Sequence, residues 1–138
     1  MLPIENGINE GRLYNTMDSG VMINTLLILF LLWIVFRRFL PLQGVKQITT
    51  ADLKSQLKNK DKQFVDVRTP HEFRTRHIKG FKNIPLSTLP RQTNQLSKDK
   101  EVFVICQSGM RSLKASKILK KQGFKNITNI KGGMNAWH

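Results

Sequence analysis

The pattern of apolar and polar residues sets one segment apart near the start of the chain. Residues 21–36 carry no charge, and residues 26–36 are eleven apolar residues in succession. A helix over residues 21–40 would be about 30 Å long, the thickness of a bilayer's hydrocarbon core, and Pro41 would end it. A core helix would show a polar stripe, and a cleaved signal peptide would begin with a basic region, whereas the residues before this segment are acidic. We therefore predict a single transmembrane helix over residues 21–40.

The residues on either side of this helix differ in pattern. Residues 1–20 show no periodicity and little hydrophobicity, so we predict a short disordered tail. Residues 45–138 alternate short apolar runs with segments of helical periodicity. A short strand is expected to begin at Ile48. Further strands are expected at residues 64–67, 102–105 and 127–130, with a short extended piece at residues 84–86. Helices are expected from a cap at Thr49 or Thr50 to Leu57, over residues 89–96 after a cap at Ser87, and over residues 112–121 before Gly123. This alternation predicts an α/β domain whose parallel sheet is flanked by helices.

The distribution of charge along the chain predicts its orientation across the membrane. The chain has 23 Lys+Arg and 9 Asp+Glu, a net charge of +14. Residues 1–20 have a net charge of −2, and residues 37–138 have a net charge of +16. Because Lys and Arg favour the cytoplasmic side of a membrane, we expect a single-pass protein whose C-terminal domain faces the cytosol, in a bacterial cell membrane.

The basic charge also limits the partners. Nucleic acid and anionic lipid would both attract it. The basic residues are scattered from Lys46 to Lys131, and no aromatic-rich binding strand accompanies them. We therefore expect no nucleic-acid partner, and a membrane-tethered domain has anionic headgroups close by.

A single cysteine excludes an intramolecular disulfide and any zinc site with several cysteines. Cys106 directly follows residues 102–105, the most hydrophobic predicted strand, and a polar loop leads from it to a helix. Ligands of parallel sheets bind at the carboxyl ends of strands. Loop amides, the helix N-terminus and Arg111 would favour a thiolate and hold a small anion beside it. The alternative is a buried structural thiol, for which a polar loop is a poor setting.

Three motifs in order make residues 45–138 resemble the rhodanese (sulfurtransferase) domain. The first is Cys-x4-Arg after a buried strand, at residues 106–111. The second is Asp-Val-Arg-Thr-Pro-His-Glu-Phe at residues 66–73, followed by His-Ile-Lys-Gly at 77–80 and Asn-Ile-Pro at 83–85. The third is Gly-Gly-Met-Asn-Ala-Trp at residues 132–137. One position departs from the family pattern, because Phe81 stands where a small alanine is usual.

The resemblance implies a rhodanese-like fold and a reaction that needs neither a metal nor another cofactor. Cys106 would be the catalytic nucleophile, taking sulfane sulfur from a small anionic donor such as thiosulfate and passing it to a thiol or cyanide. The residues implied to bind the donor are Gln107, Ser108, Gly109, Met110 and Arg111. Related phosphatases resemble Cys-x5-Arg, so the shorter loop here favours sulfur transfer. The family also includes weakly catalytic persulfide carriers and interaction modules, which remain the alternative function.

The remaining motif residues have supporting roles in this interpretation. Asp66 and Arg68 would form a structural polar network near the loop or touch the substrate. Glu72 and His77 would support loops rather than act as acid or base, and Trp137 would contribute packing. His71 and His77 are six residues apart, which is not the spacing of a helical metal pair.

Overall fold

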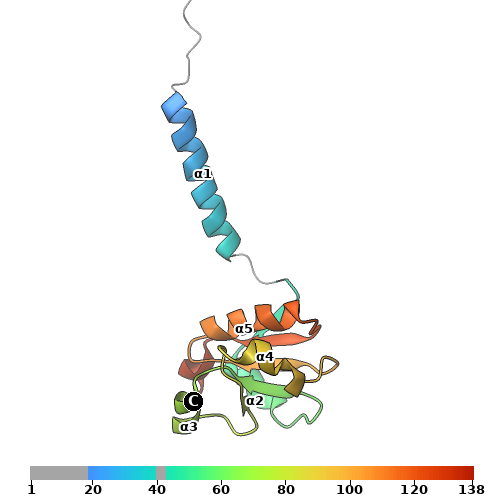
Figure 1. The fold of residues 1–138 in the computed structure, drawn as a ribbon. Coiled ribbons are helices and arrows are strands. Elements are labelled where there is room, and N and C mark those ends of the chain that lie inside the picture. Colours follow the sequence, from blue (N-terminus) through green and yellow to red (C-terminus); the bar gives the residue numbers. More distant parts are fainter. Residues whose placement is uncertain (1–18, 40–42) are drawn as a thin grey trace, which may run out of the picture. The chain divides into compact units, whose positions relative to one another are not determined.

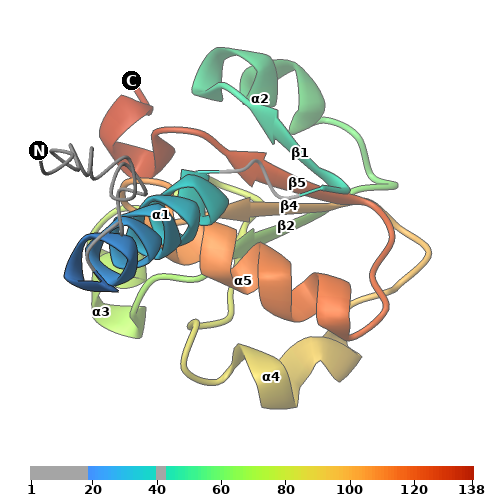
Figure 2. The ribbon, with the colours of Figure 1, turned by 90° about the horizontal axis from the view of Figure 1, so that it is seen from above.

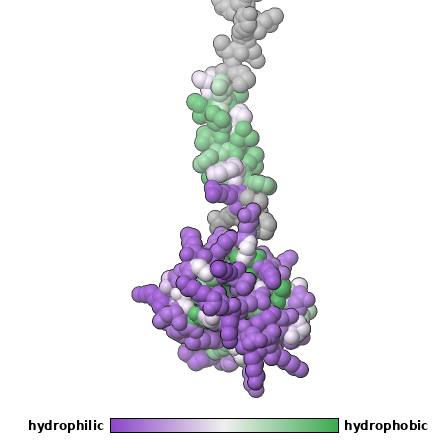
Figure 3. Space-filling model, turned by 90° about the vertical axis from the view of Figure 1, so that its right-hand side faces the viewer, coloured by the Kyte–Doolittle hydropathy of each residue, from purple (hydrophilic) through white to green (hydrophobic). Residues whose placement is uncertain are grey.

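The computed structural model describes residues 19–39 and 43–138, which form two separate units divided between Pro41 and Leu42. The first unit contains one helix, α1 (Ser19–Phe39), which is long and apolar enough to cross a membrane. Its side chains from Val21 to Phe36 are exposed, and Figure 3 shows that the surface of this helix is largely hydrophobic and that of the second unit largely hydrophilic. The predicted helix is therefore present, but it begins two residues earlier and takes in Ser19 and Gly20 from the predicted tail. Residues 1–18 and Leu40 lie outside the described residues.

The second unit contains one five-stranded sheet in which every neighbouring pair is parallel, as the alternating pattern predicts. The strand order is β1-β5-β4-β2-β3. The strands are β1 (Val45–Ile48), β2 (Gln63–Asp66), β3 (Lys82–Asn83), β4 (Val102–Ile105) and β5 (Ile127–Ile130). The central strand β4 is buried at every residue, which explains its uninterrupted apolar sequence.

Helices cover both faces of this sheet (Figures 1 and 2). They are α2 (Thr50–Gln56), α3 (Pro70–Thr75), α4 (Leu89–Gln92), α5 (Met110–Lys121) and the 3₁₀ segments η1 (Thr93–Gln95) and η2 (Gly133–Ala136). On one face, Leu89 of α4 and Leu119 of α5 pack with Val65 and Val104. On the other face, Leu53 of α2 packs with Phe103 and its neighbours. The fold is the α/β arrangement predicted from the sequence.

Several predicted boundaries were wrong, and tertiary pairing gives the reason. Ile48 ends its strand rather than beginning it, because β1 pairs along β5 from Val45 onward. The short extended piece predicted at residues 84–86 lies two residues earlier, where Lys82 and Asn83 pair with the end of β2. Ser87 does not cap α4, since Thr88 occupies the N-cap position.

One helix, α3, was missed by sequence reasoning. Thr69 is its N-cap and Pro70 stands at its start. The Thr69 hydroxyl accepts from the Glu72 backbone N–H, and the Glu72 carboxylate accepts from the Thr69 backbone N–H, which together form a capping box. The helix has six residues, too few for an amphipathic period to show. Its importance lies in where it places Glu72, which faces the loop after β4.

Candidate active site

The site lies at the carboxyl ends of the two central strands. Cys106 follows β4, and Asp66 ends the neighbouring strand β2, with Asp66 in register with Ile105. The loop after Cys106 leads directly into α5, whose first residue is Met110. The motif residues that the sequence analysis singled out are therefore brought together at one edge of the sheet, where ligands of parallel sheets bind.

The sulfur of Cys106 is enclosed by its own loop. The Gly109 amide donates a hydrogen bond to Sγ at 3.1 Å, and Sγ lies 3.3 Å from the Ser112 hydroxyl, to which its S–H donates. Cys106 is 0% exposed. The expectation that a polar loop would leave the thiol accessible was wrong, because the loop folds around the sulfur rather than away from it. The expected amide contact is present, made by Gly109.

The glycine pair of the third motif sets the position of this loop. Gly133 has φ +57, and a Cβ on it would lie 2.3 Å from the Cys106 carbonyl oxygen. This close approach lets Met134 N–H donate to the Cys106 carbonyl at 2.8 Å and Asn135 N–H donate to the Gln107 carbonyl at 2.9 Å. The C-terminal motif is thus a backbone anchor for the start of the loop, and only glycine fits at position 133.

Arg111 is paired with Glu72 rather than aimed at the sulfur. Its guanidinium donates to both carboxylate oxygens of Glu72, at 2.9 and 2.8 Å. These hydrogen bonds hold the pKa of Glu72 well below its ordinary value and raise the pKa of Arg111. Glu72 also accepts from the Thr69 backbone and hydroxyl, so the pair links the α3 cap to the start of α5. We expected the full positive charge of Arg111 to favour a thiolate at Cys106, and in the structure this charge is paired with that of Glu72. Glu72 supports the loop, as predicted.

Asp66 and Arg68 form a buried ion pair beside the loop, at 2.7 Å between the closest atoms. Arg68 also donates to the Arg76 carbonyl at 2.7 Å and to the side-chain oxygen of Gln107 at 3.3 Å. Asn83 fixes the backbone at the end of β2, because its side-chain amide donates to the carbonyls of both Asp66 and Arg68. The pair is the structural polar network that the sequence suggested, and through Gln107 it reaches the loop.

The other loop residues form the outer side of the site. Gln107 is half-buried, Ser108 is exposed, and Met110 is 65% exposed. Ser112, which was not among the predicted site residues, is fully buried and contacts the sulfur. In the sequence, Ser112 lies one helical turn after Ser108 and directly after Arg111. This position does not by itself indicate a contact with Cys106.

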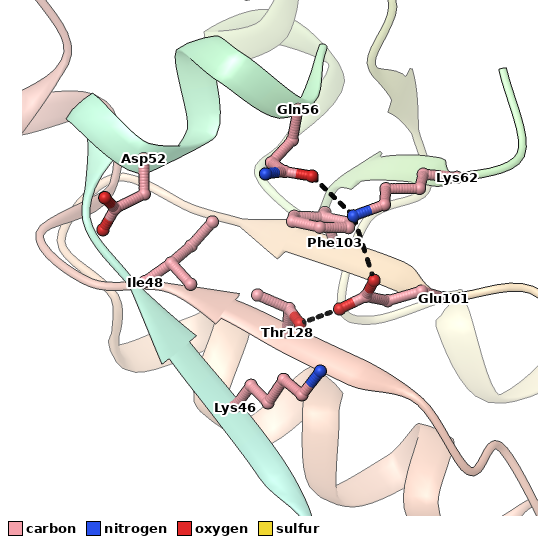
Figure 4. A pocket seen from close by; sticks show the side chains of 8 residues that line it. All are labelled: Lys46, Ile48, Asp52, Gln56, Lys62, Glu101, Phe103 and Thr128. Atoms are coloured by element: carbon pink, nitrogen blue, oxygen red, sulfur yellow. Dashed lines mark hydrogen bonds and ion pairs between the residues drawn. The ribbon is translucent and has the colours of Figure 1, made fainter. Parts of the chain in front are cut away.

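The described part of the second unit has hollows at two places that bear on the site and on α2. One, of about 320 Å³, lies beside the loop and is lined by Arg68, His71, Glu72, Thr75, Arg76, Gln107 and Met134. The other, of about 180 Å³, lies between α2 and the sheet. Figure 4 shows Lys62 there, bonded to Gln56 and Glu101 over the ring of Phe103. Cys106 lines neither hollow.

Two further predictions concern packing. Phe81, the departure from the family pattern, is buried, and its ring packs against that of Phe64 with centroids 5.3 Å apart. Trp137 packs against the cluster around Phe103, as predicted. The chain therefore accommodates the large residue within the aromatic core on the α2 face.

Comparison with known proteins gives one consistent result. The chain matches the rhodanese-like domain family over residues 49–138. It is 39% identical over 94 residues to the putative sulfurtransferase YtwF of Bacillus subtilis, covering 67% of this chain and 90% of that protein. It is 30% identical over 97 residues to the thiosulfate sulfurtransferase GlpE of Shewanella oneidensis, covering 70% and 96%.

Two further relatives are covered only in part, and a solved structure is similar over about two thirds of this chain. The chain covers 60% of the protein YqhL and 40% of the putative sulfur carrier protein YrkF, both of Bacillus subtilis, at 45% and 41% identity. A rhodanese-like domain protein from Staphylococcus aureus superposes with a TM-score of 0.63 at 38% identity, covering 67% of this chain and 91% of that one.

Proposed function

Because the chain belongs to the rhodanese-like domain family, we propose that it transfers sulfane sulfur through a persulfide on Cys106. The observation that carries this proposal is the position of the sulfur: at the end of β4, 3.1 Å from the Gly109 amide, inside a Cys-x4-Arg loop at the start of α5. A backbone amide and a helix N-terminus both favour negative charge on that sulfur. Relatives named as sulfurtransferases support the same chemistry.

The reaction has two half-reactions with thiosulfate as donor. The Cys106 thiolate attacks the outer sulfur of thiosulfate, forming an S–S bond while the bond to the sulfite group breaks and sulfite leaves with its electron pair. The persulfide then reacts with a thiol or cyanide, whose nucleophilic atom bonds to the outer sulfur, and the electron pair of the broken S–S bond returns to Cys106. Loop amides from Gln107 to Arg111 hold the anion and stabilise the charge that moves between the two sulfurs.

Access to the sulfur requires the loop to move. Cys106 is fully buried, whereas Ser108 and Met110 on the outer side of its loop are exposed. The donor therefore enters as these residues shift, while the inner side of the loop stays fixed by Gly133 and its neighbours. Arg111 contributes by holding α3 against α5 rather than by offering an unpaired charge.

The second candidate function is a persulfide carrier with little turnover of its own. The buried sulfur and the pairing of Arg111 with Glu72 favour it, and a relative is named as a putative sulfur carrier. The two functions differ in the second half-reaction. An enzyme would release many equivalents of sulfite when both thiosulfate and cyanide are present, and a carrier would release one equivalent and then stop.

Treating the purified full chain with thiosulfate and measuring its intact mass tests the proposal. The wild type is expected to gain the mass of one sulfur atom, which reduction removes. Cys106→Ser is the control, and the assignment is unambiguous because the chain has a single cysteine. A wild-type chain that gains no sulfur from thiosulfate or from a polysulfide would refute both candidate functions.

We further propose that α1 anchors the protein in a bacterial cell membrane with the C-terminal domain in the cytosol. The support is the length and apolar surface of α1 and the net charge of +16 on residues 37–138. Protease added to intact cells should leave the domain uncut, and protease added to inverted vesicles should remove it. The opposite pattern would reverse the orientation.

The basic domain is also proposed to contact anionic headgroups. The exposed surface of α5 carries Lys114, Lys117, Lys120 and Lys121, and α5 contains no acidic residue. In nanodiscs holding the full chain, anionic lipid should slow tryptic cleavage at these lysines relative to neutral lipid, and high salt should abolish the difference. Equal cleavage rates in both lipids would rule the contact out.

A further inference from the structure

Ser112 lies against the sulfur from the helix side of the loop, and three hydrogen bonds close a ring there. The Gly109 amide donates to Cys106 Sγ at 3.1 Å, the thiol donates to Ser112 Oγ at 3.3 Å, and the Ser112 hydroxyl donates to the Gly109 carbonyl at 3.1 Å. Both Cys106 and Ser112 are fully buried. In the thiol form, therefore, Ser112 accepts from the sulfur and directs its own proton to the loop backbone.

The hydrogen bond between Ser112 and the sulfur can reverse its direction when the thiol loses its proton. A hydroxyl both donates and accepts, and its hydrogen rotates to suit its partner. The Gly109 carbonyl has a second donor, because Leu113 N–H bonds to it at 3.2 Å in the first turn of α5. The Ser112 hydroxyl can turn toward a thiolate without leaving that carbonyl unpaired. A hydrogen bond to an ionised sulfur is stronger than one to the neutral carbonyl, so the thiolate gains from the exchange.

The charged side chains around the sulfur are paired with one another, so a neutral donor such as Ser112 has a part in stabilising the thiolate. On β2 the facing groups are Asp66 and Arg68, which neutralise each other. On α3 and α5 they are Glu72 and Arg111, which do the same. Strand β5 and the segment η2 bring no ionisable side chain, and the neighbouring hollow adds His71 and Arg76, which are exposed to solvent. Each of the first four charges is paired with an opposite one, and the neutral donors that contact the sulfur are the Gly109 amide and the Ser112 hydroxyl.

We propose that Ser112 is a further catalytic residue, whose hydroxyl switches from accepting the Cys106 thiol proton to donating to the thiolate and so sets its population. The proposal rests on the proposed function, because it assumes that the thiolate is the working form. It applies twice in the reaction: Ser112 donates to the sulfur before attack on the donor, and again when the sulfur leaves the persulfide with the electron pair of the S–S bond.

The test is a pH titration of thiolate absorbance near the ultraviolet edge on the full chain in a transparent detergent, with Cys106→Ser as the blank. The single cysteine assigns the whole signal to Cys106. Ser112→Ala should raise the titration midpoint by about one pH unit. Ser112→Thr, which keeps the hydroxyl, should return it toward the wild-type value.

Ser116→Ala is the matched control. Ser116 is buried one turn further along the same face of α5, and its hydroxyl donates to the Ser112 carbonyl at 2.8 Å without contacting the sulfur. Its midpoint should equal that of the wild type. An unchanged midpoint in Ser112→Ala, an equal shift in Ser116→Ala, or a Ser112→Thr midpoint equal to that of Ser112→Ala would overturn the proposal. The titration does not require sulfur transfer, so it stands apart from the persulfide test, which addresses the proposed function.

Discussion

Arg111 binds Glu72 with both of its terminal nitrogens, although the two residues are 39 positions apart in the chain. The contact joins the first turn of α3 to the first turn of α5, and the side chains are 30% and 35% exposed. The arginine of the Cys-x4-Arg motif is therefore a structural clamp on the loop in this state, and its positive charge is compensated before any substrate arrives.

Glu72→Gln should lower the free energy of unfolding at pH 7 by about 1 kcal/mol, a modest value because solvent screens this pair. The hydrogen bonds from Arg111 hold the pKa of Glu72 well below the ordinary value near 4.3. The stabilisation is thus complete above about pH 5 and is lost as the pH falls. Urea unfolding at pH 7 and pH 3 should show that the difference between the two proteins becomes smaller at the lower pH. Asp99→Asn, an exposed carboxylate outside this pair, is the control. A constant difference between wild type and Glu72→Gln across pH would contradict the assignment.

Asp66→Ala should lower the free energy of unfolding by about 3 kcal/mol or more, because it leaves the Arg68 guanidinium buried without its counter-charge. Replacing both residues, as in Asp66→Leu with Arg68→Met, should cost less than the sum of the single changes. Equilibrium denaturation of the wild type, Asp66→Leu, Arg68→Met and the double variant gives the coupling. Lys79→Ala, on an exposed residue, should have almost no effect. Additive costs would mean that the pair contributes no coupling.

Gly133→Ala should displace the loop that holds Cys106. The new Cβ would sit 2.3 Å from the Cys106 carbonyl, so backbone must move in addition to the strain of a positive φ. Gly80→Ala isolates the strain alone, since Gly80 has φ +95 and a Cβ added there would have no neighbouring atom within 4 Å. We expect Gly80→Ala to cost about 1–2 kcal/mol and Gly133→Ala to cost more. Persulfide formation should fall only in Gly133→Ala. Equal losses in the two variants would show that close packing at Gly133 is not needed.

Phe81→Ala should lower the free energy of unfolding by about 3 kcal/mol, because the ring packs against Phe64 in the aromatic core and its removal leaves a cavity. Persulfide formation should survive, since Phe81 is absent from the contacts of the Cys106 loop. Thermal unfolding with a parallel persulfide assay checks both points. A cost below about 1 kcal/mol would mean that the core collapses around the small alanine usual in the family.

The strands that the sequence predicted well are those whose burial is uniform. Residues 102–105 and 127–130 are strands at the expected positions. The first is continuously apolar, as a strand covered on both faces requires, and the second has buried isoleucines at both ends. The edge strand β3 has only two residues, Lys82 and Asn83, and its place follows from pairing with β2 rather than from its own composition. No local pattern could have located it.

The sequence placed Cys106 and its loop after the most hydrophobic strand, where the structure has them, but it did not predict the ion pair between Arg111 and Glu72 or the contact of Ser112 with the sulfur. The motif spacing identified Cys106 and the residues of its loop, because the backbone geometry of that loop needs a glycine and a following helix. The pairing of Arg111 with Glu72 depends on α3, a helix that was not predicted. The sequence therefore did not show that Glu72 compensates the charge of Arg111. Burial of the sulfur depends on the approach of Gly133, 27 positions away in sequence, which a reading of the loop alone does not contain.

The pairing of β1 with β5 places the beginning and end of the domain side by side, with Val45 opposite Ile127. During synthesis β1 is made early, close behind the segment that forms α1, and its partner is made last. Until residue 130 has been made, β4 has an unpaired edge along Val102 and Val104, an apolar strand that other chains can join. Contacts of such long sequence separation also form slowly. Folding of this domain is therefore completed only after β5 has been made, and a chain truncated before β5 is expected to aggregate rather than to fold partially.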